Sequence, residues 1–202
     1  MQSMSLVDDL AVYQPFNEQE AADKEVILAA LRDNSPACFD RGAQAHLACS
    51  IWTVSPDAAQ TLAVYHNIYD SWSWIGGHAD GEQDLAAVAL RELEEETGVH
   101  GSLVDCGCGG IYSCEVLTVD GHVKRGAYVS SHLHLNVTYL AVADPGEPLR
   151  VKPDENSAVA WMPVEELYER STEPWIKERI YRKLIDKLQT LELPLSSNIP
   201  RS

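Results

Sequence analysis

The stretch that decides the fold runs from Gly76 to Val99 and reads GGHADGEQDLAAVALRELEEETGV. It opens with three glycines in six positions, which predict a tight loop whose backbone approaches another group closely. A helix is predicted to follow, because Asp84 is a good N-cap residue and Gly98 suits the C′ position. The stretch therefore combines a glycine loop with a capped helix, and the side chains of that helix carry the chemical information.

The predicted helix has two distinct faces. Its apolar residues recur at helical spacing and predict a buried stripe of Leu85, Ala89 and Leu93, with Ala86 and Leu90 beside them. On the other face, Glu92, Glu95 and Glu96 stand at i, i+3 and i+4, so their carboxylates converge. Carboxylates gathered in this way favour a hard divalent cation, Mg²⁺ with Mn²⁺ as the alternative. A solvated acidic face, neutralised by Arg91 at i, i+4 to Glu95, is the competing interpretation.

This stretch resembles the Nudix box, whose pattern is G-x5-E-x7-R-E-U-x-E-E-x-G-U, where U is an apolar residue. Residues 91–99 fit every position of the second half, and Gly77 supplies the leading glycine. One position departs from the pattern, since Gln83 stands where the family has Glu. Carboxylates flank it at Glu82 and Asp84, so a small slip of the loop would bring one of them into its place.

The resemblance extends more weakly over residues 44–170, where Glu155 is similar to the late acidic position of the family. It implies an α/β fold, a Nudix-like α/β/α sandwich with a mixed sheet and with helical extensions at both ends. The expected parts are an N-terminal helical extension, a Nudix-like catalytic domain, and a C-terminal helix and tail, over residues 1–43, 44–171 and 172–202.

Residue patterns outside the box agree with a mixed α/β chain. Asn17 is a good N-cap for a helix over 18–33, and a proline at N1 opens a final helix over 175–191. Alternating apolar runs and turn residues predict strands over 46–54, 61–66, 110–119 and 128–142. Lys124 and Arg125 are assigned to a basic loop, and residues 196–202 to a loose tail.

By resemblance, Glu92, Glu95 and Glu96 would bind the metal ion, and the metal would bind a small-molecule diphosphate. A water molecule would attack one phosphorus and displace the other phosphate. Glu92 and Glu155 are both candidates for the base that accepts the proton of that water, and Arg91 is expected to orient the glutamates. The implied activity is Mg²⁺-dependent cleavage of a diphosphate linkage, in a nucleoside diphosphate-X type or a related phosphorylated metabolite.

Candidates for substrate binding lie in the box loop and on one later strand. In the loop they are Gly76, Gly77 and His78. On the strand, strict alternation puts His132, His134 and Asn136 on one face. That face lines either the substrate cavity or an exposed side of the sheet, and His46 and His78 are expected to join it in the first case. A His-x-His pair also suggests zinc, but two further ligands do not stand nearby in the sequence.

Composition limits the partners of this chain. Its 202 residues carry 31 acidic and 15 basic side chains, giving a net charge of −16. This charge argues against DNA or RNA polymers and against an anionic membrane surface as partners. Residues 80–96 hold seven of the acidic side chains and only Arg91 as a base, so part of the charge is arranged for cations.

Other features predict a cytoplasmic protein. The five cysteines lack paired CxxC spacing and are expected to be reduced thiols. The N-terminus lacks the pattern of a secretory signal, and no stretch of 18 apolar residues occurs. The terminal helices are expected to close the sheet, cover the pocket or form a homodimer.

Two other functions compete with hydrolysis. Isopentenyl diphosphate isomerase resembles this fold, but Gly76 occupies the position of its catalytic cysteine. A non-catalytic Nudix-like ligand sensor is the second alternative, since Gln83 is a lost box residue. A sensor acting on DNA needs a basic reader, and residues 1–43 hold only three cations, Lys24, Arg32 and Arg41.

Overall fold

The computed structural model describes residues 5–34, 36–124 and 126–191. Its helices are α1 (Leu6–Val12), α2 (Glu18–Asn34), α3 (Leu85–Thr97), α4 (Val164–Arg170) and α5 (Arg182–Thr190), with short 3-10 segments η1 (Ala37–Phe39) and η2 (Cys108–Gly110) and a π-helical segment η3 (Ile176–Tyr181). Its strands are β1 (Ala45–Val54), β2 (Gln60–His66), β3 (Ser71–Ser73), β4 (Ile75–His78), β5 (Gly101–Leu103), β6 (Ile111–Val119), β7 (His122–Lys124), β8 (Ala127–Val129), β9 (His132–Ala143) and β10 (Asn156–Pro163).

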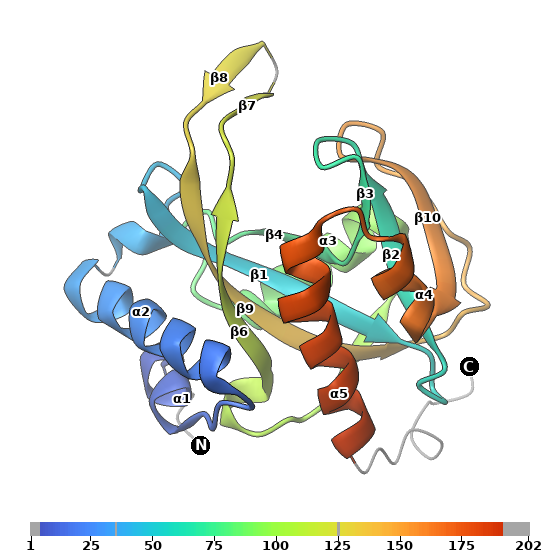
Figure 1. Ribbon diagram of the computed structural model, residues 1–202, viewed down its shortest axis with the longest axis horizontal. Coiled ribbons are helices and arrows are strands. Elements are labelled where there is room, and N and C mark those ends of the chain that lie inside the picture. The colour runs from blue at the N-terminus through green and yellow to red at the C-terminus, as the bar shows by residue number, and fades with distance from the viewer. Residues whose placement is uncertain (1–4, 35, 125, 192–202) are drawn as a thin grey trace. The chain divides into compact units, whose positions relative to one another are not determined.

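The strands form one large sheet and one small one. Eight strands make a sheet with the order β10-β2-β1-β9-β5, in which β3 pairs with β2, β4 with β1 and β6 with β9. Strands β7 and β8 form a separate antiparallel pair. The predicted α/β fold class is confirmed, since the chain combines a large sheet with helices that lie before it, within it at α3, and after it along the chain (Figure 1).

The chain forms two compact units, each assembled from three segments. The first unit takes its described residues from Met1–Ser50, Gly76–Ala89 and Asp105–Tyr139, and the second takes them from Ile51–Ile75, Leu90–Val104 and Leu140–Ser202. The box is therefore shared, because the chain passes from one unit to the other within α3. The glycine loop belongs to the first unit and the glutamates belong to the second.

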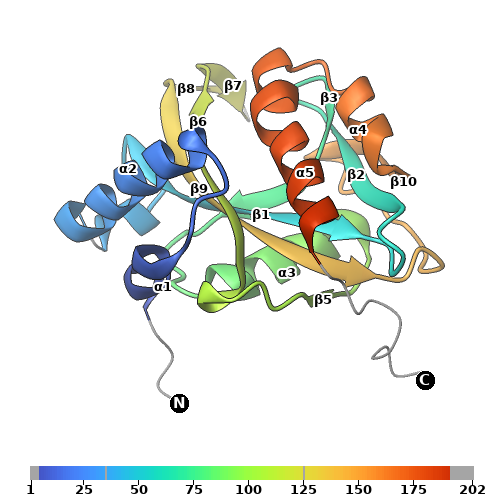
Figure 2. The same ribbon diagram turned by 60° about the horizontal axis from the view of Figure 1, so that its bottom comes forward.

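In the first unit, α2 packs on β6, and β6 pairs with β9 (Figure 2). The helix begins as predicted, because the Oδ1 atom of Asn17 accepts the backbone N–H of Glu20 at 2.9 Å. Helix α1 was not predicted. It is short, and a capping box between Ser5 and Asp8 stabilises its first turn.

In the second unit, β2 pairs with both β10 and β3, and α4 packs against all three strands. The π-helical segment η3, which leads directly into α5, ends with Tyr181, and this residue is fully buried. Its hydroxyl donates to Ser73 Oγ and accepts the backbone N–H of Trp74, both at 3.3 Å. The rings of Trp52 and Trp74 each lie 5.7 Å from the Tyr181 ring. Tyr181 thus fixes the final helix to this part of the sheet.

The predicted basic loop and the long strand after it differ from the structure. Residues 122–124 and 127–129 pair as the β7–β8 hairpin, and Gly126 before β8 has a φ of 80°. The predicted run 128–142 is divided between β8 and β9, because the chain leaves the strand conformation at residues 130 and 131. In Figure 1 the hairpin extends beyond the ends of β6 and β9. Arg125 and residues 196–202 lie outside the described residues.

The structure bears on the cysteines and on membrane-spanning helices. All five cysteines are free thiols: Cys38, Cys49, Cys106, Cys108 and Cys114. Among the described residues, no helix is both long enough and apolar enough to cross a bilayer.

Candidate active site

Helix α3 begins and ends where the sequence predicts. The backbone N–H of Ala87 donates to Asp84 Oδ1 at 3.0 Å, which caps the first turn. Gly98 adopts a φ of 77°, and its N–H donates to the carbonyl of Glu94 at 2.8 Å. The buried stripe consists of Leu85, Val88, Ala89 and Leu93, whereas Ala86 and Leu90, also expected in it, are only part-buried. Burial of this stripe leaves the glutamates on the remaining face.

Three carboxylates converge within the second unit. Glu92 and Glu96 of α3 and Glu155 from the loop before β10 each offer an oxygen, and these oxygens all lie within 4.8 Å of one another. Glu96 is only 3% exposed. Asn156 fastens the loop to the helix, because its amide donates to the backbone carbonyl of Glu96 at 3.1 Å and its Oδ1 accepts the N–H of Lys152 at 3.1 Å. The late acidic position of the sequence pattern thus joins the box glutamates.

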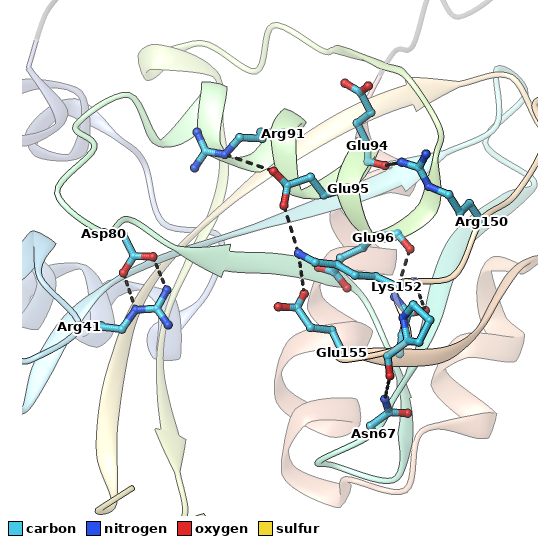
Figure 3. Close-up of polar contacts among 12 residues, drawn as sticks. Arg41, Asn67, Asp80, Arg91, Glu94, Glu95, Glu96, Arg150, Lys152 and Glu155 are labelled. Carbon is cyan, nitrogen blue, oxygen red and sulfur yellow. Dashed lines mark hydrogen bonds and ion pairs between the residues drawn. The ribbon is translucent and has the colours of Figure 1, made fainter. Parts of the chain in front are cut away.

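A lysine that the sequence analysis did not single out lies among these carboxylates. The Nζ of Lys152 is 3.1 Å from Glu95 Oε2 and 3.1 Å from Glu155 Oε2 (Figure 3). Burial alone would lower the pKa of Lys152, but the hydrogen bonds to Glu95 and Glu155 raise it above its usual value. The ammonium therefore stays charged and compensates part of the acidic charge. The only sequence signal for this pair is the i, i+3 spacing of Lys152 and Glu155.

The donor set fits a hard divalent cation. Burial raises the pKa of Glu92, the charge of Lys152 opposes that shift, and the neighbouring Glu95 and Glu155 add to it. These are signs of crowded carboxylates that one ammonium does not fully neutralise. All the donors are carboxylate oxygens, the ligands preferred by Mg²⁺. Glu92, Glu96 and Glu155 are the residues placed to hold such an ion.

Arg91 and Glu95 lie at the exposed side of this cluster. Arg91 Nε is 4.0 Å from Glu95 Oε1, and both side chains are about half exposed, at 49% and 48%. Glu95 is therefore held between Arg91 and Lys152, as Figure 3 shows. Of the three box glutamates, Glu95 is the one whose carboxylate is engaged by two cations.

The glycine loop lies in the first unit, where Gly76 and Gly77 belong to β4. A Cβ on Gly76 would lie 2.5 Å from the carbonyl oxygen of Cys49, so this position requires glycine. Gln83 is exposed, and its backbone N–H donates to Glu82 Oε1 at 2.8 Å. The carboxylate of Glu82, next to the altered box position Gln83, thus accepts a hydrogen bond from the backbone of its own turn.

The predicted histidines lie together in the first unit, and His46 joins them. The ring nitrogens of His46, His78, His132 and His134 lie within 4.8 Å of one another. Burial lowers the pKa of His46 and, together with the three neighbouring rings, lowers that of His134 to about 2. Strand alternation predicted only that His132 and His134 share a face of β9, and His46 and His78, expected to join them, come from β1 and β4, which are far from β9 in the chain.

Asn136 follows the histidines on β9 but takes part in a different network. It is 1% exposed, and its amide donates to Glu115 Oε2 at 2.9 Å and to Thr138 Oγ1 at 3.1 Å. Its Oδ1 accepts the hydroxyl of Ser50 at 3.0 Å. Each of these contacts is with a buried protein side chain.

Comparison with known proteins identifies the protein family. The NUDIX domain family matches residues 46–184. A Caenorhabditis elegans Ap4A hydrolase is 17% identical in sequence, with a TM-score of 0.51, over 72% of this chain and 98% of its own. The Escherichia coli dihydroneopterin triphosphate pyrophosphohydrolase is 14% identical, with a TM-score of 0.52, over 69% of this chain and 95% of its own. A search of curated proteins gives no match.

Fold and site define an α/β protein whose box helix and late loop bring three carboxylates together. With the family match over residues 46–184, the chain belongs to the Nudix hydrolase family.

Proposed function

We propose that this protein is a Mg²⁺-dependent pyrophosphohydrolase that cleaves a diphosphate linkage in a small phosphorylated metabolite, of the nucleoside diphosphate-X type or a related one. The observation that carries this proposal is the convergence of Glu92, Glu96 and Glu155 within 4.8 Å. Two of these carboxylates come from the family's box helix and one from a distant loop. Such a group is suited to a metal that also binds phosphate oxygens.

The roles follow from the chemistry of each side chain. When bound, Mg²⁺ neutralises the oxygens of the diphosphate and lowers the pKa of a water molecule. Glu92, Glu95 and Glu96 would hold the ion, and Glu95 would do so by giving up its contact with Lys152. Glu155 lies close enough to Glu92 and Glu96 to be a further ligand. Glu92 and Glu155 are the candidates for the proton acceptor. Since burial raises the pKa of Glu92, its carboxylate is closer to the range of an effective general base.

Arg91 is a positioning residue in this scheme. Its guanidinium lies beside Glu95 and is half exposed, which suits a residue that orients a glutamate. For the substrate, the proposed contacts are with the glycine loop at Gly76 and Gly77. His78, His132, His134 and Asn136 are the other contacts expected from the sequence, but the three histidines converge on one another and on His46, and Asn136 is held by buried protein side chains. The names of the two similar structures give different phosphorylated compounds, so the test covers several substrate classes.

The test is a phosphate-release screen with Mg²⁺ over nucleoside diphosphate sugars, dinucleoside polyphosphates, nucleoside triphosphates and non-nucleotide diphosphates. We expect turnover of at least one class, and a loss of about 100-fold or more in Glu92→Gln and Glu95→Gln, comparable with losing a donor that stabilises a transition state. Turnover by both variants at the rate of the unmodified protein would contradict the proposal.

The same screen separates the alternatives. Isomerisation of isopentenyl diphosphate without phosphate release would indicate the isomerase. Against it stands Gly76, because a cysteine there would put its Cβ 2.5 Å from the Cys49 carbonyl oxygen. Binding of a diphosphate without turnover would indicate the sensor. The presence of all three helix glutamates, Glu92, Glu95 and Glu96, favours the enzyme over the sensor.

A further inference from the structure

The four histidines of the first unit converge through their ring nitrogens. The Nε2 atom of His134 lies 3.2 Å from Nε2 of His78 and 3.2 Å from Nε2 of His132. The ring centroid of His46 is 5.2 Å from that of His78 and 5.0 Å from those of His132 and His134. The four rings therefore surround one small space with nitrogen atoms.

Hydrogen bonds determine which ring nitrogen carries the hydrogen, that is the tautomer, in two of these histidines. The Nδ1 atom of His46 is 2.8 Å from the carbonyl oxygen of Ala43, and that of His132 is 2.8 Å from the carbonyl oxygen of Ser130. A carbonyl only accepts, so each Nδ1 carries the hydrogen and each Nε2 of a neutral ring presents its lone pair. Histidines that bind a metal are usually oriented by this kind of second hydrogen bond.

The Nε2 atom of His46 is the observation that points to a ligand. The side chain of His46 is 2% exposed, and its Nε2 is buried without a hydrogen-bond partner. A buried acceptor left in this state costs about 1–3 kcal/mol. In addition, the Nε2 atom of a neutral His134 carries at most one hydrogen, so it can donate to only one of its two neighbours, the Nε2 atoms of His78 and His132 at 3.2 Å. A cation at the centre would satisfy all of these lone pairs together.

We infer that His46, His78, His132 and His134 form a binding site for a divalent transition metal, with Zn²⁺ as the expected ion. Imidazole nitrogen suits zinc, whereas Mg²⁺ prefers oxygen. With Zn–N bonds of about 2.0–2.1 Å, a tetrahedral site places its nitrogens roughly 3.3 Å apart. The observed separations of 3.2 Å agree with this geometry.

The site would join three strands of the first unit. His46 stands on β1, His78 at the end of β4, and His132 and His134 at the start of β9. Nearby, Arg41 and Asp80 form a bidentate ion pair, which Figure 3 shows. Asp80 lies in the box loop, two residues after His78 at the end of β4. A zinc ion with four protein ligands is a closed, structural type of site, so its role would be to hold this loop in place.

The test uses the untagged full chain, stripped of metal by a chelator and then exposed to Zn²⁺. We expect one tightly bound zinc per chain, a higher melting temperature, and the visible absorption of tetrahedral Co²⁺ when cobalt replaces zinc. His134→Gln and His132→Gln should each weaken zinc binding by about 10-fold or more. His132 is part-exposed, so His132→Gln is the variant expected to keep the fold, which circular dichroism checks.

Two control variants make the result specific. His100→Gln removes an exposed histidine of the second unit, and Glu96→Gln removes a carboxylate of the proposed magnesium site. Both should bind zinc as the unmodified chain does. The inference is overturned if zinc does not bind, if Glu96→Gln abolishes binding, or if folded His132→Gln and His134→Gln bind as tightly as the unmodified chain. Zinc binding is measured without substrate, so a result that overturns the zinc site is distinct from a result that overturns the proposed hydrolysis.

Discussion

At the scale of single residues, Lys152 occupies part of the space that a metal ion would share. Its ammonium is 3.1 Å from both Glu95 and Glu155 and therefore competes with Mg²⁺ for their oxygens. Lys152→Gln removes this competitor, so the Mg²⁺ concentration for half-maximal phosphate release should fall by about 3- to 10-fold. The control is Lys177→Gln, whose lysine lies over the ring of Tyr168. An unchanged or higher Mg²⁺ requirement in Lys152→Gln would show that the lysine does not compete.

Gly76 gives a second prediction at this scale. Gly76→Ala places a Cβ 2.5 Å from a backbone oxygen, so β4 or β1 must move, at a cost of about 2–4 kcal/mol in the free energy of unfolding. Gly81→Ala is the matched control. Gly81 has a φ of 88° but open space around its Cβ, so the expected cost is only the backbone strain of about 1–2 kcal/mol. Urea unfolding of both variants compares the two costs, and equal values would exclude the clash.

At the scale of elements, β6 and β9 share a buried polar network centred on Glu115. Its carboxylate accepts hydrogen bonds from Ser113, from Asn136 at 2.9 Å and from Thr138 at 2.8 Å. Glu115→Ala removes the acceptor of the buried donors Asn136 and Thr138, whereas Ser113 still has Glu20 Oε1 at 2.6 Å, so the free energy of unfolding should fall by about 2–3 kcal/mol or more. Thr118→Ala, at an exposed position of the same strand, should change it by only about 0.5 kcal/mol. Similar values for the two variants would contradict the importance of this network.

Elements with a strong local signal could be predicted from the sequence. The helices at 18–34 and 85–97 have side-chain caps at their starts, and the strands at 45–54 and 60–66 are bounded by turn residues. The β7–β8 hairpin and α1 were not predicted because both are short: α1 has 7 residues and each hairpin strand has 3, too few to establish a hydrophobic period.

At the scale of the whole molecule, contacts between distant segments limited the prediction of the sites. The grouping of Glu92 with Glu96 follows from helical spacing, but the position of Lys152 depends on how the loop before β10 folds. In the same way, His-x-His on β9 indicates two metal ligands, while His46 and His78 come from two other strands. Such a set becomes visible only when the topology of the sheet is known.

The net charge of −16 gives a prediction at this scale as well. An anionic diphosphate is repelled by the acidic box until a metal ion compensates its charge. Removal of divalent cations with a chelator should therefore reduce phosphate release to the level without protein, and Mg²⁺ should restore it. Full activity in excess chelator would contradict metal dependence.

The central claim is that the box carboxylates hold the metal on which hydrolysis depends. Its most direct test is the Mg²⁺ dependence of phosphate release in two variants of one helix, Glu96→Gln in the buried cluster and Glu94→Gln at an exposed position. We predict that Glu94→Gln follows the curve of the unmodified protein. Glu96→Gln should lose activity by about 100-fold or require far more Mg²⁺. Overlapping curves for Glu96→Gln and Glu94→Gln would contradict the claim.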